Sequence, residues 1–109
     1  MKVLLDVCTP VQVRLALPGH EVHTAVKMGW GELENGGLLR QAELAGFDLF
    51  VICDKNLRYQ QNLADRRLAI LELGTNHRPT LERHFPLIQL SAESMQPGEY
   101  RALPTPLGA

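Results

Sequence analysis

Apolar residues gather in short runs, and these runs alternate with stretches of helical spacing. The run Leu49-Phe50-Val51-Ile52 predicts a strand buried on both faces of a sheet. Further runs predict strands at residues 2–6, 20–25 and 68–73 and a short fifth strand at 99–103. Apolar positions repeat with helical spacing over 35–45 and over 79–95. The alternation predicts an α/β fold, a three-layer sandwich around a mostly parallel sheet of four or five strands, with right-handed crossovers.

Several residues predict where helices begin and end. Thr9 and Pro10 are typical of a helix start, with Thr9 as the capping residue. Asn35 caps the middle helix, which Gly46 then ends. Pro86 interrupts the apolar stripe of the last helix and should kink or split that helix.

The 109 residues suffice for one domain, which we assign to residues 1–103, followed by a loose tail at 104–109. The apolar runs are shorter than the roughly 18 residues of a membrane helix, so we expect no membrane association. The chain starts as a strand without the features of a secretion signal, which favours the cytoplasm. Cys8 and Cys53 fit a reducing compartment, and Cys53 is expected to be a small core residue.

The net charge of −1 excludes a global basic field for binding nucleic acid. The charge is uneven, however, because residues 55–84 contain six basic and three acidic side chains. This surplus is interpreted either as a local patch that faces phosphates or as an ordinary solvated surface. Neither the cysteines nor the histidines have the spacing of a zinc site, and no glycine-rich phosphate loop is present.

Two acids follow two of the predicted strands, Asp6 after residues 2–5 and Asp54 after the central run. The carboxyl ends of parallel strands meet at one edge of a sheet, where ligands bind. A carboxylate pair there could bind Mg²⁺ or Mn²⁺, with Asn35 as a neutral ligand. The expected substrate contacts at this edge are Asn56, Lys55, Arg58, Thr75 and Asn76. The structural alternatives are that Asp6 caps the next helix and that Asp54 stabilises a turn.

At these residues the chain resembles the PIN-like domain family, in particular its short stand-alone branch of predicted toxin ribonucleases. The resemblance covers roughly residues 1–85 and depends on the order and spacing of short pieces: 2–6, 17–22, 28–30, 35–39, 45–48, 54–57 and 59–63. It implies a sheet whose strand-end acids, Asp6 and Asp54 here, bind divalent metal for RNA cleavage. It also implies an antitoxin partner and a homodimer.

The chain departs from the family pattern at three positions where metal-binding relatives commonly have acids. These positions hold Val7, Asn35 and Gly37. Two functions therefore stay open at this point: a Mg²⁺- or Mn²⁺-dependent ribonuclease of the toxin type with a weakened site, or a PIN-like domain without catalysis that binds RNA or a protein. A phospho-acceptor receiver domain is a weaker third alternative, because the first strand offers only Asp6 and Lys55 directly follows Asp54.

Overall fold

The computed structural model of the chain describes residues 1–53 and 66–103, apart from the side chain of Asn35. Its first half contains β1 (Lys2–Leu5), the 3-10 helix η1 (Val11–Ala16), β2 (Glu21–Thr24), α1 (Asn35–Leu44) and β3 (Leu49–Ile52). Its second half contains β4 (Ala69–Glu72), α3 (Arg78–Arg83), α4 (Phe85–Ser94) and β5 (Tyr100–Ala102). Among the described residues, no helix is long and apolar enough to cross a membrane.

The five strands form one sheet in the order β2-β1-β3-β4-β5, and every neighbouring pair is parallel. The α/β class and the fifth strand are thus confirmed. In a doubly wound sheet of this order, the direction of strand addition reverses between β1 and β3. Consecutive side chains of a strand point to opposite faces, so all four residues of β3 can be buried.

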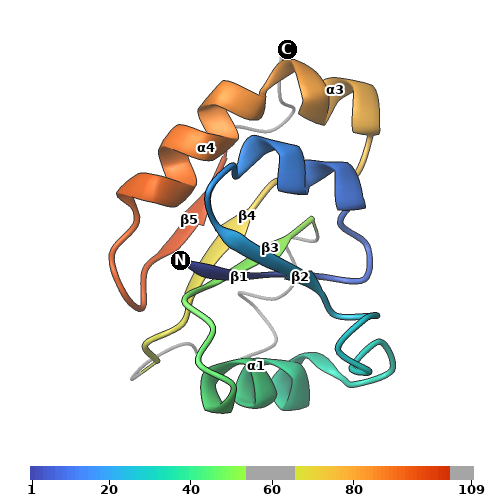
Figure 1. Cartoon of the computed structure of the whole chain (residues 1–109), viewed down its shortest axis with the longest axis vertical. Coiled ribbons are helices and arrows are strands. Elements are labelled where there is room, and N and C mark those ends of the chain that lie inside the picture. Colours follow the sequence, from blue (N-terminus) through green and yellow to red (C-terminus); the bar gives the residue numbers. More distant parts are fainter. Residues whose placement is uncertain (54–65, 104–109) are drawn as a thin grey trace.

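Helical segments cover both faces of the sheet (Figure 1). On one face, here called the η1 face, Leu5, Val51 and Leu71 pack against η1, α3 and α4. On the other, the α1 face, Leu4, Phe50 and other apolar side chains pack against Leu38, Leu39 and Ala42 of α1. Each face therefore buries its own apolar cluster, as expected for a parallel sheet.

The crossover connection from β4 to β5 differs in handedness from the connection from β1 to β2. The two connections run in opposite directions across the sheet, yet their helices lie on the same η1 face. Two such connections must have opposite hands, so the expectation of uniformly right-handed crossovers is wrong. Packing between α4 and η1 supports the unusual connection, because Val13 and Ala16 join Ile88 and Ala92 in one buried cluster.

Helix boundaries agree with the sequence in two places and differ in two. Pro86 lies in the first turn of α4, and His84 separates α4 from α3, so the predicted split is confirmed. Gly46 follows α1 with a φ of 81°, a backbone conformation that suits glycine. The N-cap of α1 is Glu34 rather than Asn35, and the N-cap of η1 is Pro10 rather than Thr9.

Candidate functional site at the carboxyl edge of the sheet

Asp6 lies directly after β1, at the carboxyl edge of the sheet. Its amide donates to the carbonyl oxygen of Val51 at 3.0 Å, which fixes the end of β1 beside β3. Leu5 in turn accepts a hydrogen bond from the amide of Ala25 at 2.9 Å, so the end of β2 lies on the other side. The half-buried Asp6 therefore occupies the point where the strand order reverses.

A turn after Asp6 is fastened to β3 by Thr9. The amide of Thr9 donates to the carbonyl oxygen of Asp6 at 3.0 Å and closes the turn. Its buried hydroxyl donates to the carbonyl oxygen of Val51 at 3.1 Å and lies 3.5 Å from the sulfur of Cys53. Thr9 thus holds the turn rather than capping a helix, and η1 has no side-chain cap, so Asp6 does not cap it either.

Strand alternation puts Asp6 on the α1 face. Leu4, two residues earlier, packs in the cluster of that face, whereas Leu5 packs on the η1 face. The same alternation and the pairing of Ile52 with Glu72 put Glu72 on the α1 face as well. Asp6 and Glu72 therefore lie on either side of Ile52, at one level of the sheet and on one face.

Glu72 is an acid that the sequence reasoning missed as a site residue. Glu72 as a whole is 2% exposed, and the hydroxyl of Tyr100 on β5 donates to its Oε1 at 2.5 Å. A carboxylate buried in a strand requires such partners because its desolvation is costly. The signal was present in the sequence, since Glu72 stands between Leu71 and Leu73 in an otherwise apolar run.

The other predicted site residues divide into three groups. Asp54, Lys55, Asn56 and Arg58 lie outside the described residues, so the Asp6–Asp54 pair stays a prediction. Asn35 begins α1, which starts on the side of the carboxyl ends of the strands (Figure 1). Thr75 and Asn76 follow β4 at the same edge; the hydroxyl of Thr75 accepts a hydrogen bond from the amide of His77 at 3.1 Å, and Asn76 is exposed.

The described part of the chain, 1–53 and 66–103, contains no group of three or more His, Cys, Asp and Glu side chains able to hold a metal ion. Neither Cys8 nor Cys53 is in a disulfide, and Cys53 is buried as predicted. A cation at the carboxyl edge would therefore need Asp54 or its neighbours in addition to Asp6. Trp30 packs edge-on against Phe47, with 5.9 Å between the ring centroids, at the margin of the apolar cluster on the α1 face.

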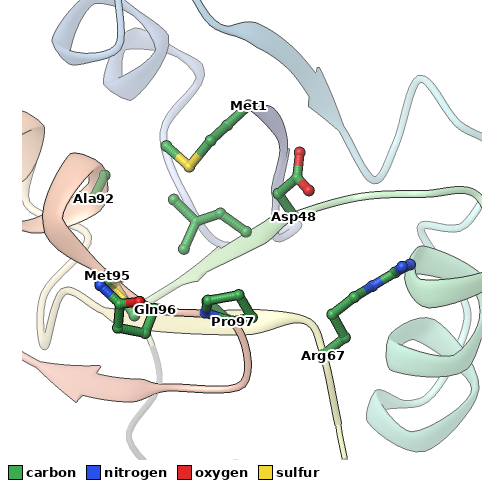
Figure 2. Close-up of a pocket in the computed structure, with 9 residues that line it drawn as sticks. Met1, Asp48, Arg67, Ala92, Met95, Gln96 and Pro97 are labelled. Atoms are coloured by element: carbon green, nitrogen blue, oxygen red, sulfur yellow. The ribbon is translucent and has the colours of Figure 1, made fainter.

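A pocket of about 390 Å³ lies at the opposite, amino edge of the sheet. Figure 2 shows it between the chain before β1, β3 and β4 and the end of α4, with Met1, Asp48, Arg67, Met95 and Pro97 among its lining residues. Ligands of open parallel sheets bind beyond the carboxyl ends of the strands. We therefore place the candidate site at the strand-end acids and not at this pocket.

Among the described residues, Glu21, Glu93 and Glu99 have a lowered pKa, and they lie on surface parts of β2, α4 and the turn before β5. Hydrogen bonds from His23 and His20 lower the pKa of Glu21 and of Glu93, respectively. The pKa of Glu99 is lowered first by the backbone amide of Gln96 and then by Arg101. These groups belong to surface contacts of β2, α4 and β5, which stabilise the fold rather than form a reactive centre.

A scan against protein-family models, a search of curated proteins and a search of solved structures each found no match for this chain.

Proposed function

We propose that the chain is a PIN-like three-layer sandwich and a Mg²⁺- or Mn²⁺-dependent ribonuclease, the toxin-like component of a toxin–antitoxin pair. The observation that supports this most is the position of Asp6. It directly follows β1 where the strand order reverses, it does not cap η1, and its amide donates to β3, the strand that leads to Asp54. An acid at this position suits metal binding better than helix capping.

The chemistry follows from the ligands that a hard cation prefers. Asp6 and Asp54 would hold the ion, with Asn35 as a neutral oxygen donor. A bound Mg²⁺ or Mn²⁺ lowers the pKa of a water molecule and stabilises negative charge on a phosphate. Glu72 lies on the same face and edge as Asp6, and the hydroxyl of Tyr100 fixes the position of its side chain.

Basic side chains close to the carboxyl edge suit an RNA substrate. The helix α3 begins at this edge, six residues after β4 ends, and contains Arg78 and Arg83. Arg78 pairs with Glu82 at 3.2 Å, while the exposed Arg83 donates, among the described residues, to the hydroxyl of Thr80 alone, at 3.4 Å. Arg83 can therefore contact a phosphate without losing an ion pair.

Exposed apolar residues at the same edge suit a small antitoxin. Val7 follows β1, Val26 lies just beyond β2, and Leu33 precedes α1; their exposures are 50%, 63% and 42%. A partner that covers these residues would also cover Asp6. A homodimer remains part of the proposal through the resemblance alone.

The second candidate is a PIN-like domain that binds RNA or a protein without cleaving. It is favoured by α1, whose first turn holds Asn35 and Gly37 where metal-binding relatives have acids. This candidate shares the fold with the first and differs from it in metal affinity.

RNA cleavage with Mn²⁺ separates the two candidates. The variants are Asp6→Asn and Asp54→Asn, with Asp48→Asn as the control, because Asp48 is an exposed acid at the opposite end of β3. We expect the wild type and Asp48→Asn to cleave a single-stranded RNA and the other two variants to lose at least about a hundredfold in rate, the scale of an electrostatic catalytic group. Equal cleavage by all four proteins would exclude this site.

A further inference from the structure

The two cysteines of the chain lie side by side although 45 positions separate them in the sequence. The thiol of Cys53, at the end of β3, donates to the carbonyl oxygen of Cys8 with a sulfur–oxygen distance of 3.6 Å. The hydroxyl of Thr9 lies 3.5 Å from the same sulfur. The fold has thus brought both thiol-bearing residues to the turn that follows Asp6.

The two cysteines differ in their access to solvent. Cys8 is exposed, whereas Cys53 is only 9% exposed. The carbonyl oxygen and Cα of one residue are about 2.4 Å apart, so the Cys53 sulfur, 3.6 Å from the Cys8 carbonyl oxygen, lies within roughly 6 Å of the Cys8 Cα. An exposed thiol that meets an oxidant first and a buried thiol within reach of it are the two parts of a redox pair.

We propose that Cys8 and Cys53 are such a pair, that a peroxide converts them into an intramolecular disulfide, and that this bond displaces the turn behind Asp6. The formation of the disulfide depends on the two cysteines alone. The expected loss of metal affinity rests on the function proposed above, because it assumes that Asp6 binds a cation.

The chemistry takes place in two steps. The Cys8 thiolate attacks one peroxide oxygen, the O–O bond breaks, and Cys8 becomes a sulfenic acid while hydroxide leaves and takes up the thiol proton as water. Cys53 then attacks the Cys8 sulfur, the S–O bond breaks, and the leaving hydroxide takes the Cys53 proton as a second water. Two thiols are oxidised to one disulfide, and one peroxide is reduced to two waters.

We expect closure of this bond to move residues 6–9. The disulfide joins the sulfurs at about 2.05 Å, whereas in the reduced chain the Cys53 sulfur faces the carbonyl oxygen of Cys8. Because β1 and β3 are fixed by their ladder, we expect the rotation to take place in the turn that Thr9 closes onto Asp6. The hydrogen bond from Thr9 to Val51 would break, and Asp6 would lose its support.

The test treats the reduced full chain with hydrogen peroxide under native conditions. Intact mass spectrometry should show the loss of two hydrogen atoms, and peptide mapping should link Cys8 to Cys53. The variants Cys8→Ser and Cys53→Ser should not form this link, and a dithiol reductant should restore the wild type. A stable addition of oxygen, or a link only between two chains, would overturn the proposal.

Measuring Mn²⁺ binding to the reduced and the oxidised protein then tests the second part of the proposal, that the disulfide weakens metal binding by Asp6. We expect the oxidised wild type to bind Mn²⁺ about tenfold more weakly than the reduced form, the scale of a lost positioning contact, while Cys8→Ser is unaffected by peroxide. Equal affinity of the two wild-type forms would refute the coupling to Asp6. If the reduced protein binds no Mn²⁺, the proposed function fails, whereas the disulfide result stands by itself.

Discussion

Replacement of Tyr100 by phenylalanine removes the hydroxyl that donates to the buried carboxylate of Glu72. The bond is 2.5 Å long, and Glu72 is 2% exposed. A hydrogen bond to a charged group contributes about 1.5–3 kcal/mol, and leaving a buried acceptor with one partner fewer costs a similar amount. We therefore expect Tyr100→Phe to lower the free energy of unfolding by about 1.5–3 kcal/mol.

Urea unfolding and thermal melting can measure this loss. Each kcal/mol corresponds to roughly 4–8 °C in Tm for a domain of about this size, so Tm should fall by at least about 6 °C. The matched background is Glu72→Gln, which keeps a similar shape and an oxygen acceptor but has no charge. In the Glu72→Gln background, Tyr100 can still donate a hydrogen bond to a neutral acceptor, which contributes about 0.5–1.5 kcal/mol. Tyr100→Phe should therefore lower the free energy of unfolding about half as much in that background as in the wild type.

A double-mutant cycle decides whether this reasoning holds. The four proteins are the wild type, the two single variants and the double variant, and the cycle isolates the term that joins Tyr100 to Glu72. If Tyr100→Phe lowers stability equally in both backgrounds, its effect does not come from the Glu72 carboxylate. If it lowers stability in neither, the contact has no energetic role and Glu72 is held in another way.

Gly98→Ala should lower the free energy of unfolding by at least about 1 kcal/mol more than Gly46→Ala does, as measured by urea unfolding. Both glycines have a positive φ, but of the two only Gly98 is placed so that an added Cβ would collide with the backbone oxygen of Arg66. Equal losses of stability in the two variants would contradict this reasoning. The hydrogen bond from His20 lowers the pKa of Glu93 below its ordinary value of 4.5 in the folded state. The stability difference between wild type and Glu93→Gln should therefore be present at neutral pH and should be lost as the pH falls through this lowered pKa and Glu93 becomes protonated. A difference that persists in acid would show that the charge of Glu93 is not its source.

Much of the fold could be predicted because it depends on local patterns. The run around Phe50 has no polar residue, so only a strand covered on both faces fits it. Pro86 has no amide hydrogen and so cannot extend the hydrogen bonding of α3, but it is tolerated in the first turn of a new helix. Its position in the sequence therefore marks the break between α3 and α4. Gly46 likewise marks the end of α1.

Features that depend on tertiary contacts could not be predicted. The hydroxyl of Thr9 has a good local use as a cap, but β3 offers it the carbonyl oxygen of Val51, which only the folded sheet brings near. The hand of the last crossover depends on packing between α4 and η1, which no local pattern encodes. Of the candidate site, the sequence identified Asp6 at its strand end and overlooked Glu72, since one acid in an apolar run is not a motif.

Binding of Mn²⁺ at the carboxyl edge is the central claim, and electron paramagnetic resonance of the free ion measures it directly. Titration of the reduced wild type should show saturable binding at one site per chain. Asp6→Asn and Asp54→Asn should abolish it, whereas Asp48→Asn, at the amino end of β3, should bind as the wild type does. Binding that survives both Asp6→Asn and Asp54→Asn, or no saturable binding by the wild type, would contradict the account.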